Sequence, residues 1–228
     1  LYRLQERIRL VQPGKRRLGL AALYAILVAW APMALFSAAE GLAIGPTRLE
    51  SFLMDFEVNV RFLVTVPIFL FAESICGEKL RAIVRQFRDA GLVLNEARDR
   101  FEQLVQDTIR LSHSKRAEIA LMCLAYVHSM IAFAYVLYYP EATWRLPVRD
   151  GRHFLSVTGG WYFLVAFPLF SFLLLRWLWR IIFWVRLLRQ ISKLELTLPS
   201  APRDEAGGLG FLSGSLSAFA GFVFGGTA

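Results

Sequence analysis

Five polar side chains lie in or beside one apolar stretch that is long enough to cross a bilayer. The stretch runs from residue 55 to residue 76 and carries Asp55, Glu57, Asn59, Arg61 and Glu73. A charged side chain near the centre of a membrane costs from ~2.5 to more than 10 kcal/mol, depending on the method. Such residues therefore face other helices, a water-filled cavity or the head groups. This pattern indicates a polar path that could select ions, and the five residues are our candidates to line it.

The charges of this stretch divide between two helical faces. Glu57 and Arg61 are four residues apart, so they lie on one face of a helix, where an ion pair can form. Asp55, Asn59 and Glu73 fall on nearly the opposite face. Two interpretations of Glu57 and Arg61 are open: an ion pair at the membrane boundary, or ion selection at a pore mouth. For Glu73, near the other boundary, we expect a basic partner at the head groups.

A histidine and a tyrosine of the third apolar segment are the remaining candidates for the polar path. His128 lies close to the middle of this segment, and Tyr135 and Tyr139 share one helical face beyond it. An imidazole at the midplane can relay protons or sense pH. It can also be a neutral ring that is hydrogen-bonded to a neighbouring helix. We therefore add His128 and Tyr135 to the candidates, and both interpretations of the histidine stay open.

No motif for catalysis, nucleotide binding or metal binding occurs in the sequence. It contains no hydrolase elbow, zincin helix, paired-cysteine motif, nucleotide fingerprint or potassium-filter sequence. His113, His128 and His153 are expected at three different depths, which argues against a shared metal site or a catalytic triad. Cys76 and Cys123 have no nearby His or Cys partner. We expect no enzyme activity, no cofactor and no metal.

The composition indicates a membrane protein. Of the 228 residues, 56% are hydrophobic and 19% are charged. Soluble domains contain about 45–50% apolar and about 25% charged residues. The net charge of +8 comes from basic residues that cluster beside apolar segments, so nucleic-acid binding is not expected.

Four complete spans and part of a fifth must position the polar candidates, which makes the expected fold an all-α polytopic membrane protein. The first span, Leu18–Ala39, has 22 residues and covers about 33 Å, enough for a hydrocarbon core of about 30 Å. Because the last apolar segment has no stop signal at Ala228, we expect a truncated or partial span there. The predicted units are a basic amphipathic arm (1–17), a transmembrane hairpin (18–76), a cytoplasmic helical segment (77–117), spans three and four with a cytoplasmic extension (118–198), and a linker with the partial fifth span (199–228).

The segment 77–117 shows two helical apolar stripes, with a break expected at Gly91. These helices could pack on each other, on other subunits or on the membrane surface. The stripes are Leu80, Ile83, Val84 and Phe87, and then Phe101, Leu104, Val105, Thr108 and Ile109.

The basic residues predict the orientation. Six lie in the arm 1–17 and nine in the segment 77–117, whereas the loop 140–160 between spans three and four carries three arginines. By the positive-inside bias, the N-terminus is cytoplasmic in a bacterial-type inner membrane. We expect the arginines of the loop 140–160 to pair with the acidic residues of 40–57. Expected contacts with lipid head groups are Lys15, Arg16, Arg17, Arg176 and Arg180.

Together these features favour an oligomeric ion channel or small-solute transport protein. The expected partners are the lipid bilayer, further copies of the chain, and ions or small solutes. The alternative is a non-conducting scaffold or sensor whose cytoplasmic helices bind a partner.

Overall fold

The computed structural model describes residues 15–89, 97–112, 114–194 and 219, with the side chains of residues 15–18 left aside. The chain is mostly helical, and four helices are long and apolar enough to span a membrane: Gly19–Ala39, Phe56–Asp89, Lys115–Tyr138 and Val157–Ile191. This agrees with the predicted helical membrane protein. The predicted arm 1–17 lies largely outside the described residues, as does the predicted fifth span, of which only Phe219 is described.

The described elements occur in the following order along the chain. They are α2 (Lys15–Ala39), α3 (Phe56–Val60), the π-helical turn η1 (Arg61–Thr65), α4 (Val66–Asp89), α5 (Arg98–Ser112), α6 (Lys115–Tyr138), strands β1 (Val148–Arg149) and β2 (Arg152–His153), α7 (Val157–Trp161), the π-helical turn η3 (Tyr162–Ala166) and α8 (Phe167–Ile191).

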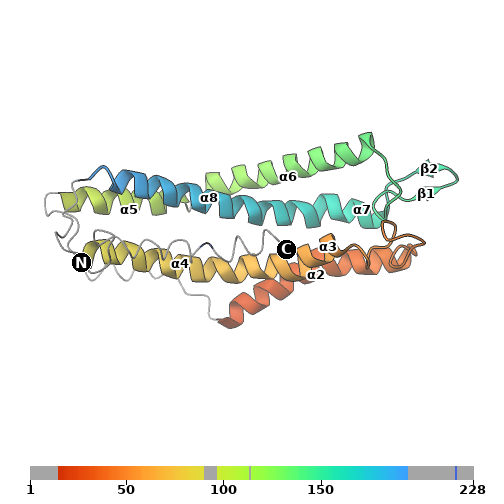
Figure 1. The fold of residues 1–228 in the computed structure, drawn as a ribbon, viewed down its shortest axis with the longest axis horizontal. Helices are drawn as coiled ribbons and strands as arrows, with labels where there is room; N and C mark the ends of the chain where they lie inside the picture. Colours follow the sequence, from red (N-terminus) through yellow and green to blue (C-terminus); the bar gives the residue numbers. More distant parts are fainter. Residues whose placement is uncertain (1–14, 90–96, 113, 195–218, 220–228) are drawn as a thin grey trace, which may run out of the picture.

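The spans form two hairpins that lie side by side (Figure 1). In the first, α2 packs against the helix α3–η1–α4; in the second, α6 packs against α7–η3–α8. The connections 40–55 and 139–156 meet at one end of the molecule, which we call the loop end, and β1 and β2 pair there as a short antiparallel hairpin. At the opposite end, which we call the α5 end, α5 packs on α8.

The two hairpins repeat one design, with corresponding residues 101 positions apart, as Arg61 and Tyr162 are. Residues 61–71 read RFLVTVPIFLF and residues 162–172 read YFLVAFPLFSF, identical at six of eleven positions. In both hairpins the second helix begins with one α-helical stretch, continues through a π turn and then carries a proline. Hydropathy and motif patterns did not predict this duplication.

The second helices of the two hairpins, α3 and α7 at their starts, are capped in the same way by a side chain. The Asp55 carboxylate accepts a hydrogen bond from the Val58 amide at 3.0 Å, and the Ser156 hydroxyl accepts one from the Gly159 amide at 2.8 Å. Each side chain thereby pairs one of the amides that a helix start leaves without an intrahelical partner. Span four therefore begins at Val157.

Carbonyl groups that prolines leave unpaired are bonded by side chains of neighbouring helices. Pro32 has no amide hydrogen for the Val28 carbonyl, and the Trp161 indole donates to that oxygen at 3.1 Å. Similarly, the Ser129 hydroxyl donates at 2.5 Å to the carbonyl of Phe163, which lies five residues before the proline after η3. Unpaired backbone groups are costly in a bilayer, so these bonds stabilise the contacts between spans.

Beyond the Arg176 level, the extensions of α4 and α8 pack with α5 around a separate core, which we call the terminal bundle. An ion pair between Arg88 and Glu102, at 2.7 Å, joins α4 to α5. The predicted apolar stripes supply half of the buried residues of this core, although Ile109 is 41% exposed. Its buried residues are Ile83, Phe87, Phe101, Val105, Trp184, Leu187, Ile191 and Leu194.

Candidate functional site

At the loop end, Asp55 connects the two hairpins. While one carboxylate oxygen caps α3, the other accepts hydrogen bonds from the Trp144 indole at 2.9 Å and from Arg145 at 3.0 Å. The ion pair with Arg145 confirms the expected pairing of the second loop with the acidic first loop. Trp144 is fully buried. Its indole has a carboxylate partner inside the protein.

Arg61 makes the second connection, through the two π turns. Its guanidinium donates to the Tyr162 hydroxyl at 2.9 Å and forms the predicted ion pair with Glu57. The guanidinium also lies 5.0 Å from the centre of the Phe170 ring. Because Tyr162 is 4% exposed while the Glu57 side chain is 73% exposed, the tyrosine is the buried partner of Arg61.

Asn59 holds the first loop against its own helix. Its carbonyl oxygen accepts from the Trp30 indole at 2.8 Å, and its amide nitrogen donates to the backbone oxygens of Phe52 at 3.0 Å and Asp55 at 2.8 Å. Buried polar groups are costly unless they are hydrogen-bonded. These bonds give Asn59 a structural role in α3 and the loop before it.

Glu73 forms the connection near the α5 end. Its carboxylate pairs with Arg176 and with Arg180, the latter at 2.8 Å, and Arg180 also donates to the Glu73 backbone oxygen at 3.2 Å. The expected basic partner is therefore present, on α8. From Val157 to Arg176 the chain covers twenty residues, or about 30 Å of helix, the thickness of a hydrocarbon core. The polar cluster at the loop end, which includes Asp55, Arg61, Arg145 and Tyr162, and the cluster around Glu73 are thus separated by one bilayer thickness.

His128 lies between these clusters, on α6. Its Nδ1 is 3.0 Å from the Ser171 hydroxyl, and its ring is 5.0 Å from the centre of the Phe167 ring. The residue is exposed in the described chain, whereas Ser171 is buried. Tyr135 is 65% exposed, with its ring 5.0 Å from Tyr139. The structure thus gathers Asp55, Glu57, Asn59 and Arg61 and leaves Glu73, His128 and Tyr135 apart.

Aromatic side chains fill the space between the hairpins. Phe62 contacts both Tyr162 and Phe170, and the Phe69 ring stacks on Phe170 at 6.2 Å. Trp177 is 3% exposed and donates to the Phe69 backbone oxygen at 3.3 Å. Trp177, like Trp184, is therefore a core residue.

Sequence reasoning missed two residues that join the hairpins, Tyr162 and Glu40, and it expected the pairing of Arg145 only at the level of the two loops. The Tyr162 hydroxyl accepts its hydrogen bond from Arg61, 101 positions away. Glu40 accepts hydrogen bonds from the amides of Val157 and Thr158, at 2.7 and 3.0 Å, and so caps the second hairpin's long helix. Comparing the chain with itself would have pointed to Tyr162, because it corresponds to Arg61 in the repeat.

The described residues contain no group of three His, Cys, Asp or Glu side chains that could hold a metal ion. Cys76 is buried and Cys123 is exposed, and neither forms a disulfide. The side chains of Lys15, Arg16 and Arg17 are not among the described ones; Arg176 and Arg180 contact Glu73, and their predicted contact with lipid stays a prediction.

No family model, curated protein or solved structure matches this chain. Its function must therefore be inferred from the two polar clusters and the terminal bundle.

Proposed function

We propose that the protein is a non-conducting scaffold or sensor of a bacterial-type inner membrane, whose terminal bundle binds a partner at the cytoplasmic surface. The observation that carries this proposal is the pairing of the polar side chains between the spans. Asp55 with Arg145, Arg61 with Tyr162, and Glu73 with Arg176 and Arg180 bond the two hairpins to each other. Charges that neutralise one another in this way are suited to holding helices together.

The terminal bundle supplies the surface for the partner. From Arg176 to Ile191, α8 continues for about 22 Å, well past the roughly 5–8 Å of one head-group layer. Residues 77–89, 98–112 and 181–194 carry ten Lys/Arg and five Asp/Glu. Complementary charge favours association, so the chemistry expected of the partner is an acidic protein surface.

An oligomeric channel or small-solute transporter is the second candidate, and the exposure of His128 favours it. A polar side chain in a span is costly against lipid, and such residues usually face protein or water. A second copy packed on α6 would cover this face, and a path would then lie on the symmetry axis.

Ion flux through the purified protein in liposomes, combined with its mass in detergent, separates the two candidates. The scaffold proposal expects no flux above that of empty liposomes, at any pH between about 5 and 8, the range in which histidine commonly titrates. Flux from an oligomer that loses its pH dependence in His128→Gln would overturn it in favour of the channel. Binding of an acidic partner is tested by Arg85→Glu with Arg189→Glu, which should abolish capture of that partner while the protein stays folded.

A further inference from the structure

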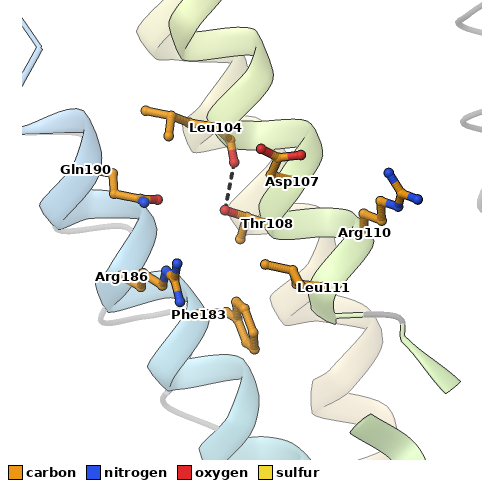
Figure 2. A pocket seen from close by; sticks show the side chains of 8 residues that line it. All are labelled: Leu104, Asp107, Thr108, Arg110, Leu111, Phe183, Arg186 and Gln190. Atoms are coloured by element: carbon orange, nitrogen blue, oxygen red, sulfur yellow. Dashed lines mark hydrogen bonds between the residues drawn. The ribbon is translucent and has the colours of Figure 1, made fainter. Parts of the chain in front are cut away.

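Between α5 and α8, at the membrane boundary, lies a groove of about 300 Å³ (Figure 2). The α8 side presents Phe183, Arg186 and Gln190, and the α5 side presents Asp107 and Thr108 among others. Two arginines line the groove, Arg186 on α8 and Arg110 on α5, and in Figure 2 the side chain of Arg110 points away from α8. Among the described residues, neither Arg186 nor Asp107 has an ion-pair partner.

Apolar side chains lie at both ends of the groove, with Leu104 on the side of Gln190 and two more nearer the spans. Phe183 and Leu111 lie at the end nearer the spans, about one turn beyond Arg180 and before the start of α6. Gln190 lies seven residues, about 10 Å, farther from the spans. Phe183 and Leu111 are therefore at the hydrocarbon boundary, and Arg186 and Asp107 are at the depth of the head groups or just beyond.

From this arrangement we infer that the groove binds the head group of a phospholipid that carries a primary ammonium, such as phosphatidylethanolamine. The phosphodiester would accept hydrogen bonds from Arg186, because a guanidinium suits phosphate oxygens. The ammonium would donate to the Asp107 carboxylate, and Phe183 with Leu111 would contact the start of an acyl chain. The Asp107 carboxylate gives the groove a partner for the ammonium of a zwitterionic head group, and a purely anionic head group has no such ammonium.

The chemistry of Asp107 makes the inference selective. A trimethylated ammonium has no hydrogen to donate, so phosphatidylcholine keeps the phosphate contact and loses the hydrogen bond to Asp107. Phosphatidylglycerol keeps the phosphate contact and offers hydroxyl groups in place of the ammonium. The expected order of affinity is thus ethanolamine, then glycerol, then choline.

Native mass spectrometry of the full chain in detergent tests this order, with three lipids of identical acyl chains. We expect phosphatidylethanolamine to bind about three- to tenfold more tightly than phosphatidylcholine. Arg186→Gln should weaken the binding of all three lipids, whereas Asp107→Asn should remove only the preference for ethanolamine. The site does not involve the proposed protein partner, so its test stands apart from the test of scaffold function.

The repeat provides a matched control, since Arg85 corresponds to Arg186 and is exposed on α4, outside the groove. Arg85→Gln should leave the binding of all three lipids unchanged. Equal affinities for ethanolamine and choline lipids, or equal losses in Arg85→Gln and Arg186→Gln, would overturn the inference. The last experiment is a competition with soluble glycerophosphoethanolamine. Displacement of the lipid at equal concentration would show that the groove binds a soluble ligand and not a membrane lipid.

Discussion

Tyr162 is the residue on which the two hairpins meet. Its hydroxyl accepts from Arg61, and its ring lies 4.7 Å from the guanidinium of Arg145 and packs edge-on to Trp144. Tyr162 thus contacts the first hairpin through Arg61, and the loop of its own hairpin through Trp144 and Arg145. Cation–π contacts of this kind contribute about 0.5–2 kcal/mol, depending on how far they are desolvated.

Removal of the Tyr162 hydroxyl should therefore be costly although the ring stays. We expect Tyr162→Phe to lower the free energy of unfolding by about 1–3 kcal/mol, because a buried hydrogen of Arg61 loses its acceptor. Thermal unfolding in detergent, at one lipid composition, measures the effect. Tyr135→Phe, on the exposed face of α6, is the control and should unfold like the wild type.

The two charges of the predicted ion pair should respond differently to substitution. The Glu57 side chain is largely exposed, and exposed pairs contribute about 0–1 kcal/mol, so Glu57→Gln should have a small effect. Arg61→Gln should cost more, since it also removes the bond to Tyr162. Equal losses in the two variants, measured by the same unfolding assay, would contradict the assignment of Tyr162 as the main partner.

In contrast to Glu57, the carboxylate of Glu73 should contribute strongly to stability, because two arginines pair with it. We expect Glu73→Gln to destabilise the protein by about 3–5 kcal/mol if the cluster is desolvated, and by less in proportion to its exposure. A double-mutant cycle with Arg180→Gln measures the coupling: the double variant should lose less than the sum of the single variants. Additive losses would show that Glu73 and Arg180 do not interact.

At the scale of the elements, the features that the sequence predicted are the helical spans, which hydrophobic periodicity and segment length determine. A span needs about twenty apolar residues, so hydropathy located all four spans, although the second helix continues to Asp89, past the predicted boundary at residue 76. The ion pair of Glu57 and Arg61 followed from local spacing. Partners such as Tyr162 for Arg61 depend on how hairpins pack, and no local pattern contains that information. For Asp55, the charges of the two loops predicted a basic partner without identifying Arg145. The π turns were missed for a related reason: one extra residue in a turn leaves hydropathy unchanged.

The proline after η3 yields a prediction about helix packing. Ser129→Ala should destabilise the protein by about 1–3 kcal/mol, because the Phe163 carbonyl then has no donor. Pro168→Ala supplies a backbone amide nearby, so the double variant should recover much of the loss. Ser112→Ala, an exposed hydroxyl bonded within its own helix, is the control. Additive losses from the two substitutions would contradict this account of the carbonyl.

At the scale of the whole molecule, the orientation of the chain can be measured by chemical labelling. The structure guides the choice of positions: Ser156 is buried as a helix cap, whereas Val148 at the loop end is 47% exposed. In a variant with Cys76 and Cys123 replaced by Ser, Val148→Cys should react with an impermeant thiol reagent added to intact cells. Gln106→Cys, exposed on α5, should react only after lysis. The reverse result would contradict a cytoplasmic α5 end.

The duplicated hairpin has a consequence for how such a protein could arise. Each repeat crosses the bilayer twice, so a copied unit returns to the side from which it began. Its basic flank is copied with it: Arg85 and Arg88 in the first unit, Arg186 and Arg189 in the second. A unit with an odd number of crossings would have inverted its copy, and the charges that orient it would have had to be rebuilt. One gene duplication and in-frame fusion could thus double this protein without any change in the signals that direct its insertion.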